Sequence, residues 1–93
     1  MKQDFFKYQG TGNDFILIDD RSNTFPKENI SLIKRLCDRR FGIGSDGFIL
    51  LKNSSVSDFK MIYFNANGNL GSLCGNGARC TVAFAKYLGC ISD

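Results

Sequence analysis

The chain opens with two short apolar segments whose composition is typical of β-strands. Residues 4–8 and 14–19 are rich in Phe and Ile, and the turn between them contains Gly10 and Gly12. Glycines in a tight connection between two apolar runs are typical of a hairpin or a bulged turn. We therefore expect the first two strands to pair as a hairpin.

The next apolar residues recur at helical spacing. They lie between residues 30 and 40 and are Ile30, Ile33, Leu36 and Cys37. Asn29 is suited to cap the start of this helix and Gly42 to end it. The charged residues of the same stretch fall mostly on the opposite side, which predicts a solvated face.

Two further strands are predicted in the second half of the chain. Residues 47–52 and 59–64 form apolar runs, and a polar turn lies between them. Asn67-Gly68 follows the second run and precedes another short apolar segment at 69–73. Asn-Gly between two such segments is a strong hairpin signal, so a further short strand is expected there.

The last predicted element is a helix over residues 76–88. Its only charged residues are Arg79 and Lys86, and apolar side chains cover most of its circumference. A helix that is apolar nearly all round is typically buried. The sequence therefore predicts an α+β fold in which a mixed or antiparallel β-sheet is wrapped around a central buried helix.

Composition narrows the choice of partners and location. The 93 residues, 43% of them hydrophobic, fit one domain. The net charge of +3 is too small and too scattered to favour nucleic acid. No apolar run reaches the length of a membrane span, and the first residues lack the apolar core of a secretory signal. We expect a cytoplasmic protein that binds neither nucleic acid nor membrane.

The absence of histidine excludes several chemistries. With no His in the sequence, Cys/His zinc fingers and Ser-His-Asp or Cys-His hydrolases are ruled out. The cysteines show no Cys-x-x-Cys spacing, so no metal site is predicted, and free thiols are expected. They are Cys37, Cys74, Cys80 and Cys90. Helical spacing assigns Cys37 and Cys80 to core packing, and no role is apparent for Cys90.

The segment most suited to chemistry runs from Cys74 to Cys80. Cys74 stands where a strand ends and the last helix begins, and a helix N-terminus favours the thiolate form of cysteine. Gly75 and Gly77 carry no side chains, so their backbone N–H groups are open to a carboxylate. These features indicate an anion site beside a reactive thiol. The alternative is a buried cysteine and a glycine-rich turn before a core helix.

Three asparagines lie in glycine-containing turns: Asn13, Asn65 and Asn76. Each alone is typical of a turn, because Asn tolerates left-handed backbone angles. Together their carboxamides, which donate and accept hydrogen bonds, suit a ligand bearing both ammonium and carboxylate. A second glycine-rich segment, residues 42–47, is interpreted as a structural turn because it lacks the ending of a phosphate-binding loop.

These segments together resemble the diaminopimelate epimerases, a family of amino-acid epimerases that work without pyridoxal phosphate. The matching stretches occur in the family's order and spacing, and they are residues 10–15, 37–47, 64–68 and 74–80. The resemblance implies interconversion of LL- and meso-diaminopimelate, in lysine and peptidoglycan precursor synthesis, with no cofactor. It also implies that Cys74 is one of two catalytic acid/bases, that Gly75 and Asn76 hold the substrate's α-carboxylate, and that Asn13 and Asn65 contact its polar groups.

The length of the chain is the main departure from the family pattern. Members have two similar domains, each supplying one cysteine, and inversion of a stereocentre needs a group on each face. Residues 1–93 are thus expected to be the N-terminal part of the first domain, with an incomplete sheet and the second domain absent. We expect no epimerisation by this chain without its C-terminal half or a homodimeric partner.

Two other functions remain open on the sequence alone. A truncated, non-catalytic domain could bind a small amino acid or pair with a partner chain through an exposed strand edge. A thiol-based redox sensor centred on Cys74 is the other.

Overall fold

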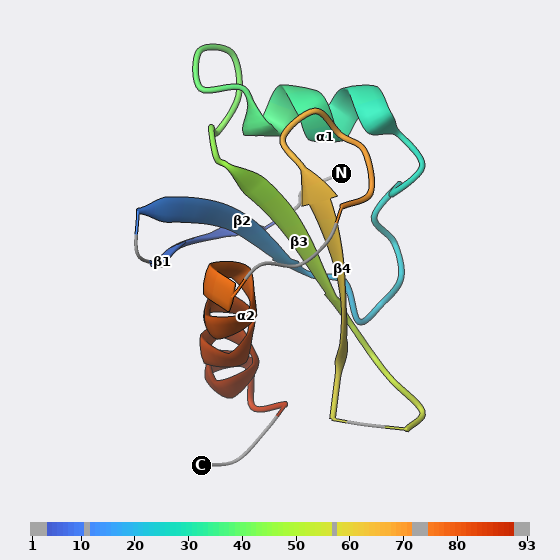
Figure 1. The fold of residues 1–93 in the computed structure, drawn as a ribbon. Helices are drawn as coiled ribbons and strands as arrows, with labels where there is room; N and C mark the ends of the chain where they lie inside the picture. The colour runs from blue at the N-terminus through green and yellow to red at the C-terminus, as the bar shows by residue number, and fades with distance from the viewer. Residues whose placement is uncertain (1–3, 11, 57, 72–74, 91–93) are drawn as a thin grey trace.

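The computed structural model describes residues 4–10, 12–56, 58–71 and 75–90 (Figure 1). Within these residues the chain forms four strands and two helices. Their bounds in chain order are β1 (Phe6–Gly10), β2 (Asn13–Asp19), α1 (Ile30–Cys37), β3 (Gly47–Lys52), β4 (Lys60–Asn65) and α2 (Gly75–Leu88). No helix among the described residues is long and apolar enough to cross a membrane.

The strands form one mixed sheet in the order β1-β2-β3-β4. β1 and β2 pair antiparallel as the predicted hairpin, and β3 and β4 are also antiparallel. β2 and β3 are parallel, and α1 lies in the crossover that connects them. The expected α+β class with a mixed sheet is therefore confirmed.

The two helices cover opposite faces of this sheet (Figure 1). Because successive strand residues point to opposite faces, Ile16 and Ile18 of β2 pack on the α1 side, whereas Phe15 and Leu17 pack on the α2 side. Every residue of β3 is buried. The two central strands thus have both faces covered, which explains their continuous apolar sequences.

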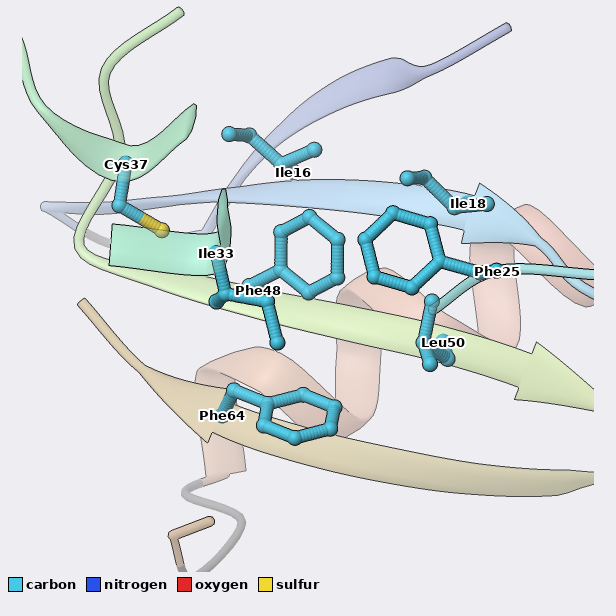
Figure 2. Close-up of a cluster of buried hydrophobic side chains, with 8 residues drawn as sticks. All are labelled: Ile16, Ile18, Phe25, Ile33, Cys37, Phe48, Leu50 and Phe64. Carbon is cyan, nitrogen blue, oxygen red and sulfur yellow. The ribbon is translucent and has the colours of Figure 1, made fainter. Parts of the chain in front are cut away.

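The core under α1 is dominated by aromatic and branched side chains. Figure 2 shows the rings of Phe25 and Phe48 side by side in this cluster. Their centroids are 5.2 Å apart and their planes are tilted by 39°. Cys37 and Ile33 point into the same cluster from α1. Both are at most 4% exposed, so the apolar stripe predicted for this helix is its buried face.

The sheet covers only one side of α2. Cys80, Phe84 and Ala85 are buried against the sheet, whereas Val82 and Tyr87 are 41% and 68% exposed. The apolar side chains of this helix therefore fall into two groups. One side completes the core, and the other presents apolar groups to solvent.

The helix α1 begins as predicted but ends earlier. The side chain of Asn29 accepts a hydrogen bond from the N–H of Leu32 at 3.0 Å, which confirms the cap. The helix ends at Cys37, three residues before the predicted Arg40. The carboxylate of Asp38 accepts hydrogen bonds from the backbone N–H groups of Arg40 and Phe41, at 2.8 and 2.9 Å. These bonds stabilise a turn in place of another helical turn.

The turn after β4 also follows the prediction in part. The N–H of Gly68 donates to the carbonyl of Asn65 at 2.9 Å, and Gly68 has a φ of 90°. The positive φ explains the glycine of the Asn-Gly signal. In place of the strand expected at 69–73, the described residues show a single β-bridge between Phe64 and Leu70, and residues 72–73 lie outside the described part.

Candidate functional site

Two of the predicted site residues lie at one end of the sheet. β2 begins at Asn13, β3 begins at Gly47 and β4 ends at Asn65. Gly47 pairs directly with Asn65, and it also pairs with Phe15, two residues after Asn13. Adjacent strands are about 4.8 Å apart, so the backbones of Asn13 and Asn65 are separated by roughly 10–12 Å across β3.

The N-terminus of α2 lies at the same end. After the C-terminal end of the helix, Cys90 accepts a hydrogen bond at 3.3 Å from the guanidinium of Arg21, which follows β2. The end of α2 therefore lies near the end of β2, and Figure 1 shows the helix axis crossing the strands on one face of the sheet. The 14 residues of α2 span about 21 Å, close to the roughly 23 Å of the seven-residue strand. We infer that α2 begins on the side of the sheet where β2 begins.

A shallow pocket beside the second and third turns of α2 supports this placement. It lies between the end of β1 and the helix, and its lining is Tyr8, Gln9, Gly10, Arg79, Cys80 and Ala83. Since β1 ends where the β1–β2 turn begins, the helix start and the turn that precedes Asn13 are neighbours. Gly10 of the first motif and Arg79 and Cys80 of the last thus lie at one pocket although nearly 70 residues separate them.

Two of the three residues predicted at the helix start belong to α2. Cys74, the predicted acid/base, lies outside the described residues. Gly75 is the first residue of α2, and Asn76 is its second. The first turn of α2 contains no acidic residue. Its partial positive charge is therefore not offset by a carboxylate within the helix, which favours an anion at this point.

Asn13 is held beside an ion-pair network that the sequence did not predict. Its Nδ2 donates to Oδ2 of Asp46 at 3.3 Å. Asp14 accepts two hydrogen bonds from the guanidinium of Arg39, at 2.7 and 3.1 Å, and one from the ammonium of Lys7 at 2.8 Å. The same guanidinium lies 3.2 Å from Oδ1 of Asp46. We call Lys7, Asp14, Arg39 and Asp46 the hairpin–loop network.

This network favours the charged forms of Asp14 and Arg39. Hydrogen bonds from Arg39 and then Lys7 hold the pKa of Asp14 well below its usual range, although partial burial opposes this shift. The same pairing with Asp14 raises the pKa of Arg39 further above its usual value. No local pattern signals the network, because its members come from β1, β2 and the segment between α1 and β3. The glycine-rich segment 42–47, which includes Asp46, forms the loop after α1 and the first residue of β3.

Asn65 is exposed and is held in a tight turn. Its backbone N–H donates to the carbonyl of Asn69 at 2.8 Å. A side chain at Gly71 would place a Cβ 2.6 Å from Oδ1 of Asn65. The glycine therefore allows the carboxamide of Asn65 to pack directly against the returning backbone, which limits its freedom.

The three described cysteines are free thiols, and two of them are core residues. Cys37 and Cys80 are each 4% exposed, which confirms the packing role predicted for both. Burial raises the pKa of the Cys37 thiol, which also accepts a hydrogen bond from the hydroxyl of Ser45 at 3.3 Å. Among the described residues there is no cluster of three or more Cys, Asp or Glu side chains that could hold a metal ion.

The chain is similar to known proteins over most of its length. Residues 5–91 match the family model described as diaminopimelate epimerase. The chain is 62% identical over 88 residues to the diaminopimelate epimerase of Flavobacterium psychrophilum, covering 95% of this chain and 34% of that relative. It is 50% identical over 80 residues to the enzyme of the same name from Chlorobaculum tepidum, covering 86% and 31%.

The chain thus spans about a third of the length of the curated relatives it matches. A solved structure, the Bacillus anthracis phenazine biosynthesis protein of the PhzF family, superposes with a TM-score of 0.64 at 22% identity. The match covers 98% of this chain and 28% of that one, and it shows a shared fold.

Proposed function

The chain belongs to the diaminopimelate epimerase family, and we propose that it forms part of an enzyme that interconverts LL- and meso-diaminopimelate without a cofactor. The observation that carries this proposal is the match over residues 5–91. The arrangement of the described residues supports it, since Asn13 and Asn65 lie at one end of the sheet, the end towards which we infer that α2 begins. We place the reaction in lysine and peptidoglycan precursor synthesis, in the cytoplasm.

Cys74 is the acid/base that this stretch of chain contributes. In the sequence it directly precedes Gly75, the first residue of α2. The partial positive charge of a helix N-terminus lowers the pKa of a neighbouring thiol and so favours the thiolate. A thiolate placed beside the α-carbon can remove its proton, and the thiol formed can return one in the reverse direction.

The substrate's α-carboxylate binds at the backbone N–H groups that begin α2, at Gly75 and Asn76. Backbone donors at a helix N-terminus are suited to a carboxylate. Charge developing on this carboxylate as the α-proton leaves would be stabilised by the same donors. Asn13 and Asn65 supply carboxamides that contact the other polar groups of the amino acid.

A second acid/base must act on the opposite face of the α-carbon. None of the described cysteines is suited to it. Cys37 and Cys80 are buried in the two cores, and Cys90 follows the far end of α2, about 20 Å along the helix from Gly75. We propose that this group comes from a second domain outside residues 1–93, which themselves form the N-terminal part of the first domain.

Solvent exclusion is a further reason to expect a second domain. Asn65 is exposed and Asn13 is half-buried. Removal of a weakly acidic α-proton requires a site from which water is largely excluded, because bulk water weakens the interactions that stabilise the developing charge. The described residues form one wall of such a site, and a second wall would close it.

The chain alone gives the first test. The 93-residue protein and its Cys74→Ala variant are incubated with diaminopimelate in D2O, and NMR follows α-deuterium entry and inversion separately. Because the site lacks its second wall, we expect no inversion and at most slow deuterium entry, and we expect any such entry to disappear in Cys74→Ala but to persist in Cys90→Ala. Inversion by the chain alone would show that it supplies both acid/bases, contrary to the proposal.

A chimera tests the site in a complete enzyme. Residues 1–93 replace the matching third of the Flavobacterium psychrophilum relative, and epimerisation is assayed. We expect activity, a loss of about 10²–10⁴-fold in Cys74→Ser, and little change in Cys90→Ser. A folded chimera that is inactive, or one that is indifferent to Cys74→Ser, would contradict the proposed role.

A further inference from the structure

The hairpin–loop network joins the turn that carries Asn13 to the loop that precedes β3. Lys7 and Asp14 belong to the β1–β2 hairpin, whereas Arg39 and Asp46 belong to the segment between α1 and β3. Two cations balance two anions. Lys7 also donates to the carbonyl of Gly44, so both sides of the junction are held by charge and by backbone contacts.

Asp46 is fixed by several contacts. Its backbone N–H donates to the carbonyl and to Oδ1 of Asp14, each at 3.0 Å. Its Oδ2 accepts the backbone N–H of Asp14 at 3.2 Å. Its Oδ1 lies 3.2 Å from the guanidinium of Arg39. The carboxylate that faces Asn13 is therefore held on both of its oxygens.

This carboxylate determines which way the carboxamide of Asn13 points. An ionised carboxylate only accepts hydrogen bonds, and of the two ends of a carboxamide only the NH2 group donates them. The 3.3 Å contact with Oδ2 of Asp46 must therefore involve Nδ2 of Asn13. The opposite orientation would bring the carbonyl oxygen of the amide against a carboxylate, where the two would repel each other.

Stability alone does not explain the network. The side chains of Arg39 and Asp46 are 58% and 43% exposed, and ion pairs this exposed contribute little to the free energy of unfolding because water and salt screen them. Their geometric effect is larger. Without them, the carboxamide of Asn13 would lose the hydrogen bond from its Nδ2, and re-ordering it on binding would weaken the binding of a ligand.

We propose that Asp46 is a positioning residue, which, with Arg39 behind it, fixes the orientation of the Asn13 carboxamide before a ligand binds. The importance of this orientation for diaminopimelate rests on the proposed function, but the orientation itself does not. Asp46 acts through Asn13 and need not touch the substrate. Two effects of substituting Asp46 are therefore expected. The Asn13 side-chain signals change without ligand, and the affinity for diaminopimelate falls.

The first test is NMR of the 93-residue chain without ligand. The side-chain NH2 signals of Asn13 are compared in the unsubstituted chain, in Asp46→Ala and in Asp46→Asn, with Asp58→Asn as a matched loss of one exposed carboxylate. We expect the hydrogen-bonded Nδ2 proton of Asn13 to shift upfield in Asp46→Ala, to shift less in Asp46→Asn, and to stay unchanged in Asp58→Asn.

An internal reference makes this test decisive. The backbone N–H of Asp14 donates to the same Oδ2 of Asp46, so its signal reports whether the bond is lost while the fold persists. If the Asp14 signal moves and the Asn13 side-chain signals do not, the proposal is wrong. Asp46→Asn keeps one acceptor oxygen, so it provides a folded variant even if Asp46→Ala unfolds.

The second test adds diaminopimelate to the same variants. We expect Asp46→Ala to bind it about two- to tenfold more weakly than Asp58→Asn does, which is the cost of ordering one side chain on binding. If the unsubstituted chain binds no diaminopimelate, the proposed function of this chain is in question, yet the ligand-free signals still decide the role of Asp46. Binding equal in both variants would overturn the functional part of the inference.

Discussion

The ammonium of Lys52 lies 2.8 Å from Oδ2 of Asp20 in the interior of the protein, where the two side chains are 10% and 1% exposed. Asp20 directly follows β2, and Lys52 is the last residue of β3. Oδ1 of Asp20 accepts the backbone N–H groups of Thr24 and Phe25, each at 2.9 Å. This ion pair therefore holds the loop after β2 against the neighbouring strand, at the end of the sheet opposite to the candidate site.

Removing the cation of this pair should destabilise the fold. Lys52→Met leaves the carboxylate of Asp20 buried without its counter-charge, which typically costs about 3–5 kcal/mol in the free energy of unfolding. We expect about 3 kcal/mol, the lower end of that range, because two backbone N–H groups still contact Asp20. Urea unfolding measures the change. Lys60→Met, on the exposed position paired with Lys52 in β4, should change stability by less than about 0.5 kcal/mol. Equal effects would contradict this assignment.

The stability of the chain should depend on pH through Asp14. Its pKa is lower in the folded chain than in the unfolded chain, chiefly because of Arg39 and then Lys7. The ionised form therefore stabilises the fold at every pH above the unfolded pKa of about 3.9, and this contribution is lost as the pH falls below about 4 towards the folded pKa. Asp14→Asn removes the effect. We expect the variant to be less stable by about 1 kcal/mol at pH 7, since solvent screens the partly exposed partners.

Urea unfolding of both chains between pH 7 and pH 2 checks this. The difference in the free energy of unfolding between the unsubstituted chain and Asp14→Asn should be constant from pH 7 to about pH 5 and shrink below that. Asp58→Asn, which removes an exposed carboxylate, should show a much smaller difference. A difference that persists unchanged at pH 2 would mean that Asp14 stabilises the fold by means other than its charge.

Much of the fold is predictable because its strongest signals are local. The continuous apolar runs of β2 and β3 mark strands buried on both faces, and Gly10 and Gly12 mark the hairpin turn. The end of α1 is different, because the Asp38 side chain competes for the next backbone N–H groups and ends the helix at Cys37. The helical spacing of apolar residues gives no information about this competition.

The candidate site is less predictable from sequence than the fold. The asparagines are visible as motifs, and Asn13 and Asn65 come to one end of the sheet because β2 and β3 are parallel and β3 and β4 are antiparallel. The contact of Asn13 with Asp46 joins residues 33 positions apart. No periodicity or spacing rule carries that information, because it arises only when the hairpin and the loop before β3 pack together.

The contact between α2 and the sheet should depend on Phe84. This side chain is fully buried, and its ring lies 4.9 Å from that of Phe6 and 5.8 Å from that of Tyr8. Phe84→Ala leaves a cavity in the core under α2, so we expect a loss of about 3–5 kcal/mol. Tyr87→Ala, three residues along and 68% exposed, should cost much less. Circular dichroism during thermal unfolding measures both, and similar losses would contradict the packing of α2 through its Phe84 face.

Gly47 should be required at the start of β3 because of Tyr63. A Cβ added at Gly47 would lie 2.7 Å from the hydroxyl and 2.8 Å from Cε1 of Tyr63. The ring is stiff and packs edge-on against Phe15 with centroids 6.2 Å apart, so it has to move as a unit. We therefore expect Gly47→Ala to destabilise the fold by about 1–3 kcal/mol, as overpacking does.

A double-mutant cycle separates this clash from a backbone effect. Gly47→Ala is made in the unsubstituted chain and in a Tyr63→Leu background, and urea unfolding gives the four free energies. Because Leu lacks the ring atoms that the new Cβ would meet, Gly47→Ala should be nearly neutral in the second background, with a coupling energy of about 1–3 kcal/mol. If Gly47→Ala lowers the free energy of unfolding equally in both backgrounds, glycine is required for the backbone conformation of β3 and not to avoid the Tyr63 ring. A clear coupling would show that the Tyr63 ring occupies the space above Gly47, beside the paired Asn65.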